Sequence, residues 1–356
     1  MRADKIKLKK EIEDCRKALL DVMIVTGAYH DGKDIMIVGK PFDFDPYWKD
    51  TASQRLLSLG FKTSFEPNNG QVILELQNVK DTRTKIPWFN IFLFMLTLLS
   101  TFSVGAVLFE NKNIISDPLL IRYGASFAVP LMLILLFHEF GHYFFSQRSK
   151  IKTSLPYFIP GPTILGTFGA VIKSKSPFKS RKNLLDVGAS GPIAGFIISI
   201  FVVIIGLLTS EVVAEVSENS FILGDSLIFL FLSKLFLNVP EGYQVVLSPT
   251  AFAGWAGLFV TMLNLLPIGQ LDGGHITYAL LGKNQRKVSR YVVLALIPLG
   301  YFWMGWLLWA GLGLFVLNLA HPPTLNDSIP LDNKRKITGW LALGIFILCF
   351  TPIPIK

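Results

Sequence analysis

The chain has 356 residues, of which 51% are hydrophobic, and its mean hydropathy is +0.49. Soluble globular domains are less apolar than this, so the composition predicts a membrane protein. The formal net charge is +9. In a membrane protein such an excess of basic residues usually lies in the cytoplasmic loops, so it does not predict a nucleic-acid partner. Cys15 and Cys349 lie at opposite ends of the chain, which excludes a disulfide framework and a cysteine metal site.

The first 86 residues predict a small soluble domain of the α+β class. In chain order, the predicted elements are a helix over 6–23, a strand over 34–40, a short helix over 51–59, and strands over 61–65 and 71–76. The last two strands flank Pro67-Asn68-Asn69-Gly70, a hairpin signal. We therefore place a domain boundary at residues 86 and 87.

Residues 87–356 contain long apolar runs, each of which could cross or nearly cross a hydrocarbon core of about 30 Å. These runs cover 88–109, 121–147, 185–208, 248–281, 291–319 and 337–354. Four glycines interrupt the run 291–319, which we interpret as two short spans. Residues 221–237 predict an interfacial or short helix. The expected fold is mainly α, a polytopic membrane helix bundle of about six to seven spans.

Loop charges predict the orientation of these spans. Residues 148–182 contain eight Lys or Arg and no acid, and residues 282–290 contain four and no acid. Residues 209–247 contain five acids and one lysine. The positive-inside rule then places the basic loops and the N-terminal domain in the cytoplasm and the acidic loop on the opposite side. The protein is expected to be an integral, multi-pass membrane protein.

The second apolar run ends in Phe137-His138-Glu139-Phe140-Gly141-His142. Histidines at i and i+4 lie on one face of a helix, where one zinc ion can bind both imidazoles. Glu139 can then act as a general base toward water. In a soluble helix such a pair is more often a surface feature. An ionisable group in hydrocarbon, however, costs at least ~2.5–3.5 kcal/mol and persists when it is paired or functional.

A second polar motif interrupts the run 248–281 and reads Asn264-Leu265-Leu266-Pro267-Ile268-Gly269-Gln270-Leu271-Asp272-Gly273-Gly274. Pro267 and Gly269 break a membrane helix, and Asp272 follows the break. As a third ligand, Asp272 would complete two nitrogens and one oxygen and leave one position open, as in catalytic zinc sites. His275 is the competing donor; otherwise it is an interfacial histidine or a support for the ligands. Asn264 could bind a substrate backbone or an oxyanion, or be a helix-packing amide.

The interiors of the other apolar runs, over 88–109, 123–137, 187–208 and 291–319, contain no Asp, Glu, Lys, Arg or His. A zinc transporter or proton pump is expected to distribute such groups along a pathway through several helices. Their concentration in two motifs favours a single metal site and disfavours a transporter.

Together these motifs resemble those of the site-2 protease family of intramembrane metalloproteases. The family's HExxH matches His138, Glu139 and His142. Its second signature, Asn-x-x-Pro followed by Asp-Gly, matches Asn264, Pro267, Asp272 and Gly273. Gly166-Thr167-Phe168-Gly169 resembles its Gly-x-x-Gly in a re-entrant segment, and Gly191–Gly195 resembles the start of its next core helix. The resemblance covers residues 121–282.

The rest of the chain is similar to the branch known from ethylene-dependent gravitropism-deficient and yellow-green proteins. The similarity lies in the arrangement of this chain: an N-terminal α+β domain, an extra span at 88–109 and a late His321-Pro322-Pro323. Some of its members lack HExxH, which this chain keeps. We expect His321 to mark a helix end at the membrane surface.

The resemblance implies one zinc ion held by His138, His142 and Asp272, with Glu139 as the catalytic residue. Transmembrane helical proteins in the lipid bilayer would be the substrates, cut near the cytoplasmic side, with Asn264, Gly166 and Gly169 binding them. Residues 156–172 would either pair with an unwound substrate strand or pack as a loop against the bundle. The alternative is an inactive scaffold or chaperone of the same fold. No oligomeric state follows from the sequence.

Overall fold

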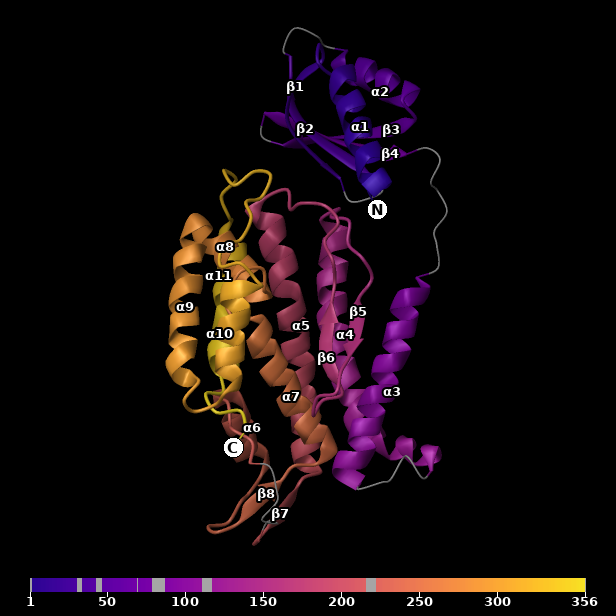
Figure 1. The fold of residues 1–356 in the computed structure, drawn as a ribbon. Helices are drawn as coiled ribbons and strands as arrows, with labels where there is room; N and C mark the ends of the chain where they lie inside the picture. The colour runs from indigo at the N-terminus through magenta and orange to yellow at the C-terminus, as the bar shows by residue number, and fades with distance from the viewer. Residues whose placement is uncertain are drawn as a thin grey trace. The chain divides into compact units, whose positions relative to one another are not determined.

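The computed structural model describes residues 2–30, 34–42, 47–68, 70–78, 87–110, 117–215 and 222–355. It divides into two units (Figure 1). Unit 1 contains Met1–Ile86 together with the short segments Ile151–Thr153 and Ser174–Phe178. Unit 2 contains Pro87–Lys150, Ser154–Lys173 and Lys179–Lys356. Each unit is described by itself below.

Unit 1 is an antiparallel sheet with two helices, which confirms the predicted α+β class. Its elements are α1 (Arg2–Ala18), β1 (Met23–His30), β2 (Ile35–Pro41), α2 (Trp48–Ser58), β3 (Phe61–Asn68) and β4 (Gln71–Asn78). The strand order is β1-β2-β4-β3. The core joins Cys15 of α1 and Leu56 of α2 to Ile37 and Leu74 of the two central strands. The tip of the predicted 67–70 hairpin includes Asn69, which lies outside the described residues.

Strand β1 was missed by the sequence analysis. The helix predicted to reach residue 23 ends at Ala18, and Met23 begins an edge strand that pairs antiparallel with β2. Leu19 and Met23 are both buried in the core, at 0% and 1% exposure. The sequence signal failed because two residues four positions apart fill one core across a turn, which mimics the spacing of a helix face.

Unit 2 is a helical bundle with two small antiparallel sheets of two strands each. Its helices are α3 (Trp88–Glu110), η1 (Pro118–Gly124), α4 (Ala125–Arg148), α5 (Arg181–Leu208), α6 (Leu227–Phe236), α7 (Pro249–Asn264), α8 (Asp272–Leu281), η2 (Gly282–Asn284), α9 (Gln285–Leu299), α10 (Gly305–Phe315) and α11 (Asn333–Cys349). Strands β5 (Tyr157–Pro160) and β6 (Thr167–Val171) form one hairpin, and β7 (Glu211–Val213) pairs with β8 (Gln244–Val246).

Three of the described helical stretches are long and apolar enough to cross a membrane. They are Trp88–Phe109, Leu119–Arg148 and Arg181–Leu208, and α6 and α10 are shorter apolar helices. The run 248–281 contains two helices, α7 and α8, separated by a turn. The run 291–319 also contains parts of two helices, α9 and α10, as the sequence favoured. The number of six to seven spans remains a prediction.

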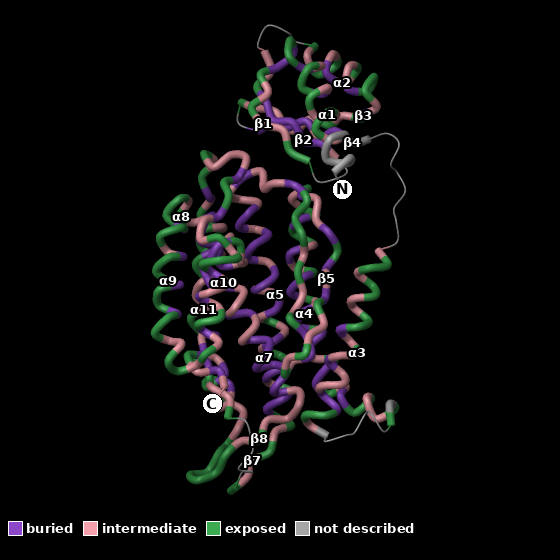
Figure 2. The backbone as a smooth tube through the Cα atoms, viewed as in Figure 1, coloured by how far each residue is buried: buried purple, intermediate pink, exposed green. Residues whose placement is uncertain are grey.

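Helix α5 lies at the centre of the bundle and packs against α4, α7 and α8. Figure 2 shows buried residues concentrated on α5 and α7, while α9 at the outside is mostly exposed. Small residues permit this close packing: a Cβ added to Gly206 would lie 2.2 Å from the backbone nitrogen of Ala251 on α7. Such contacts are the usual basis of helix association where lipid removes the hydrophobic driving force.

Candidate metal centre

Helix α4 carries the first half of the site. Its apolar sequence forms a continuous helix through His138, Glu139 and His142, and these three residues are 4%, 4% and 5% exposed. Because the two histidines are four residues apart, their rings project from the same face, with centroids 4.9 Å apart. The helix backbone therefore places both imidazoles on one face of α4.

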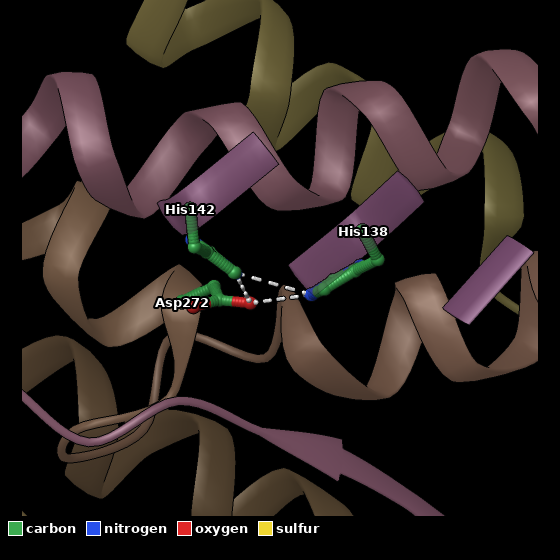
Figure 3. Close-up of side chains that lie close together, drawn as sticks. All are labelled: His138, His142 and Asp272. Atoms are coloured by element: carbon green, nitrogen blue, oxygen red, sulfur yellow. Dashed lines mark hydrogen bonds and ion pairs between the residues drawn. The ribbon is translucent and has the colours of Figure 1, made fainter. Parts of the chain in front are cut away.

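Asp272 supplies the second half from the first residue of α8. Pro267 has no N–H for a continuing helix, and Gly269 has a φ of +53°, so α7 ends and the chain turns before α8 begins. Figure 3 shows the carboxylate directed at both histidines. The Oδ2 atom of Asp272 lies 3.2 Å from Nε2 of His138 and 3.2 Å from Nε2 of His142.

These three donor atoms fit a metal ion. The two Nε2 atoms are also 3.2 Å apart, so the donors form a nearly equilateral triangle. Tetrahedral zinc with ligands at 2.0–2.1 Å requires donor separations of about 3.3 Å. Two imidazoles and one carboxylate are also the donor set of catalytic zinc sites that keep one position open.

The hydrogen bonding of His142 supports a cation at this position. Nδ1 of His142 lies 2.8 Å from the carbonyl oxygen of Val187 on α5, and because that oxygen can only accept, Nδ1 donates. Nε2 of the neutral ring then directs a lone pair at the carboxylate of Asp272. A cation between these lone pairs removes their repulsion, and the Val187 carbonyl fixes the tautomer that binds a metal.

Glu139 lies beside this group but is not part of the triangle. Its carboxylate is within electrostatic range of both histidines and of Asp272. Within the described part of the chain, its buried Oε2 atom has no hydrogen-bond partner. A buried carboxylate oxygen without a partner is rare in folded proteins and is expected where a ligand or reacting water completes the site.

Three glycines of α5 make room for the histidines. A Cβ at Gly191 would lie 2.1 Å from Nε2 of His142, and a Cβ at Gly195 would lie 3.0 Å from Nδ1 of His138. One turn earlier, a Cβ at Gly188 would lie 2.8 Å from Cβ of His275. The sequence analysis named Gly191–Gly195 only as resembling the start of a core helix, and did not single out Gly188 or Val187. Gly188, Gly191 and Gly195 are spaced by three and four residues and so lie on one face of a helix. This spacing was the sequence signal that could have identified them.

The structure also brings Asn264 to the site, at the last position of α7. Its side-chain Nδ2 lies 3.3 Å from Nε2 of His138. The amide therefore lies next to the donor triangle, where it could form a hydrogen bond with a bound ligand.

Gly166 and Gly169 lie in the β5–β6 hairpin. Gly166 has a φ of +73° and lies against α3, where its carbonyl accepts a 2.6 Å hydrogen bond from Oγ of Ser100. A Cβ at Gly166 would lie 2.9 Å from the Ser100 carbonyl oxygen. Gly169 has a φ of +97°, and a Cβ there would meet no atom within 4 Å. The absence of a side chain at Gly166 thus allows the hairpin to pack closely against α3, whereas there is open space beside Gly169.

His275 and His321 contact each other. Nδ1 of His275 lies 2.7 Å from Nε2 of His321, and His321 is only 8% exposed. His321 lies in the segment between α10 and α11, past the end of α10, and Tyr278 of α8 covers it. Its expected place at the membrane surface stays a prediction. Its neighbouring prolines suggested exposure, but the segment folds back onto the bundle.

Comparison with known proteins identifies the family to which the chain belongs. A model of peptidase family M50 matches residues 126–308, slightly more than half of the chain. This chain belongs to peptidase family M50. The matched region of this M50 protein includes all three residues of the donor triangle and Glu139.

Three curated relatives of this M50 protein carry the names of zinc metalloproteases. Probable zinc metalloprotease EGY1, chloroplastic, of Arabidopsis thaliana is 36% identical over 233 residues, covering 62% of this chain and 41% of that protein. The EGY1 protein of Oryza sativa subsp. japonica is 31% identical over 299 residues, covering 75% and 50%. Probable zinc metalloprotease EGY2, chloroplastic, of Arabidopsis thaliana is 29% identical, covering 80% and 52%. The chain thus spans about half the length of these relatives.

Proposed function

We propose that this chain is a zinc-dependent protease that hydrolyses peptide bonds of transmembrane proteins within the membrane. The observation that carries the proposal is the triangle of His138, His142 and Asp272, with 3.2 Å between donors. Both histidines and the adjacent Glu139 are buried, and Asp272 is half-buried. The zinc metalloprotease names of the relatives support the choice of metal and reaction class.

Each residue has a distinct role in the proposed mechanism. His138, His142 and Asp272 would hold the metal. A bound zinc ion supplies Lewis acidity, which activates water for attack on a peptide carbonyl at neutral pH. Glu139 would take the proton from that water and deliver it to the leaving amine. Asn264, 3.3 Å from Nε2 of His138, would donate a hydrogen bond to the substrate carbonyl as negative charge develops.

Zinc analysis combined with a cleavage assay tests this proposal. We expect detergent-purified protein to contain zinc and to cut a transmembrane test substrate, whereas Glu139→Gln should keep the zinc and lose about 10²–10⁴-fold in rate. Glu211→Gln, at an exposed position on β7, is the matched control and should leave cleavage unchanged. Near wild-type cleavage by Glu139→Gln would refute the mechanism, and a zinc-free, inactive wild type would favour the scaffold.

We also propose that the β5–β6 hairpin receives the unwound substrate. On one side, α3 packs against β5, and the Asn90 amide of α3 donates to the carbonyls of Leu155 and Pro156, just before β5, at 3.1 and 2.9 Å. Among the described residues this sheet has two strands, so the far edge of β6 has no strand partner. Backbone groups at membrane depth need partners, and a substrate strand would supply them. This would place Gly169 beside the substrate.

Cross-linking tests the placement of the substrate. In a Cys15→Ala, Cys349→Ala background, a cysteine at Phe168 of β6, which is 67% exposed, should form a disulfide with a cysteine near the cleavage site of the substrate. A cysteine at Phe201 on α5, 60% exposed, is the control. Equal cross-linking at both positions would exclude strand addition at β6.

We propose, finally, that the N-terminal domain and the basic loops face the cytoplasm and that cleavage occurs near that side. The support is the excess of Lys and Arg in residues 148–182 and of acids in residues 209–247. Single cysteines at Lys175 and Glu241, both exposed, can be labelled with a membrane-impermeant reagent. Labelling of both from one side would overturn this orientation.

A further inference from the structure

A chain of buried polar side chains supports the turn that leads to Asp272. The hydroxyl of Ser289 on α9 donates a 2.7 Å hydrogen bond to the carbonyl of Pro267 in that turn. The amide nitrogen of Gln285, one helical turn earlier, donates to the Ser289 hydroxyl at 2.7 Å and to the carbonyl of Leu319 at 3.2 Å. Ser289 and Gln285 are 0% and 1% exposed, so water does not replace these bonds.

His321 continues the chain of hydrogen bonds to α8. Its backbone N–H donates to Oε1 of Gln285 at 3.1 Å, and its Nδ1 lies 2.5 Å from the Pro322 carbonyl. Because a carbonyl only accepts, Nδ1 of His321 is the donor, and its Nε2 accepts from Nδ1 of His275 at 2.7 Å. The ring of Tyr278 stacks on His321 with a centroid distance of 4.7 Å.

The two ends of this chain meet the backbone on either side of Asp272. Pro267 precedes Asp272 by five residues, and His275 follows it by three. Between them, Gly269 approaches the segment after α10 so closely that a Cβ there would lie 2.5 Å from the carbonyl oxygen of Asn318. Polar groups buried in a low-dielectric bundle are costly to separate, so such a network holds the backbone of the turn in one conformation.

We propose that Gln285, Ser289, His321 and His275 form a brace that positions the Asp272 carboxylate against the two histidines. They are positioning residues of the metal centre, and the inference rests on the proposed function only in that it requires the triangle to bind metal. His138 and His142 are set by a continuous helix, whereas Asp272 follows a turn in which helical hydrogen bonding is lost. The brace replaces the rigidity that the turn lacks.

Metal binding, measured without any protease assay, tests the brace. Full-length protein in detergent is stripped of metal, and Zn²⁺ affinity is obtained by competition with a chelator, while the absorption of bound Co²⁺ reports the ligand geometry. The variants are Ser289→Ala, which removes the bond to Pro267, and His321→Phe, which keeps a ring against Tyr278. Ser199→Ala is the matched control, because this 0% exposed serine donates, within the described part of the chain, to the carbonyl of Gly195 in its own helix.

We expect each brace variant to bind Zn²⁺ about tenfold more weakly than wild type and to show an altered Co²⁺ spectrum, as for groups that orient metal ligands elsewhere. The double variant should lose less than the product of the two single losses, because both break one network. Ser289→Thr, which keeps the hydroxyl, should restore affinity.

Folded Ser289→Ala or His321→Phe protein with wild-type affinity and spectrum would overturn the brace. If Ser289→Ala does not fold, His321→Phe decides alone. A wild type without Zn²⁺ binding would instead refute the metal centre itself.

Discussion

The two halves of the metal centre are built in different ways. His138 and His142 lie on α4, where 3.6 residues per turn place positions i and i+4 on one face without further support. Asp272 lies at the start of α8, after a turn that contains Pro267 and a glycine with positive φ. The helical half depends on space for its rings, and the turn half depends on side chains that hold the backbone. The two halves should therefore fail in different ways when they are altered.

The largest effect is expected at the turn half. Asp272→Ala should lower zinc affinity by more than about 100-fold, because it removes a ligand and not merely a supporting group. His275→Ala should retain zinc at saturating metal, since His275 bonds His321. Elemental analysis of both purified proteins measures this. Zinc lost from His275→Ala but kept by Asp272→Ala would reverse the assignment of the third ligand.

An intermediate effect is expected where α5 makes room for the helical half. In Gly191→Ala the new methyl would lie 2.1 Å from Nε2 of His142, so the ring must shift. Zinc affinity should fall, but by less than in Asp272→Ala, because both histidine ligands remain. Overpacking of this kind costs about 1–3 kcal/mol of stability. Gly195→Ala, with 3.0 Å to His138, should be milder.

Gly311→Ala on α10 is the control for this series, because its Cβ would meet nothing within 4 Å. It should be neutral or stabilising by about 0.5–1 kcal/mol, the usual difference between alanine and glycine in a helix. Thermal unfolding and zinc content together rank the three variants. A Gly191→Ala protein that binds zinc as tightly as Gly311→Ala would contradict the proposed steric role of α5.

The smallest effect is expected at the ion pairs of Arg335, one of which joins α11 to α5 and the other of which lies at the start of α11. Arg335 donates to Asp186, the residue before Val187, and to Asp332. The bonded guanidinium lowers the pKa of Asp332 from 3.8 to about 2. Because the folded pKa is below the unfolded one, this ion pair stabilises the fold above about pH 4 and is lost as the pH falls through 2.

Thermal unfolding of wild type and Asp332→Asn at a series of pH values measures that contribution. The difference between the two proteins should be small at neutral pH, since the pair is exposed to solvent. It should decrease between pH 4 and pH 2 while zinc content at neutral pH stays equal. Loss of zinc from Asp332→Asn would show that the helical half also depends on distant anchoring.

Local sequence patterns predicted much of the fold. The apolar runs correspond to the helices of unit 2 because the backbone in lipid must satisfy its own hydrogen bonds, so a long apolar run has few alternatives to a helix. The breaks at Pro267 and within 291–319 were visible as prolines and glycines. Strand β1 could not be predicted in this way. Leu19 and Met23 have the spacing of a helix face, but they lie on either side of a turn and are buried in the same core.

The residues of the donor triangle could be named from the sequence for a related reason. Ionisable side chains are rare in apolar segments, so His138, His142 and Asp272 were conspicuous by type and position. The carbonyl of Val187 that orients His142 was invisible, because every residue has a carbonyl. Gln285 and Ser289 likewise acquire a role only when α9 lies beside the turn at Pro267. Residue chemistry is a local property that sequence records directly, whereas the partner of a backbone group or of a common polar side chain depends on which distant segments the fold brings into contact.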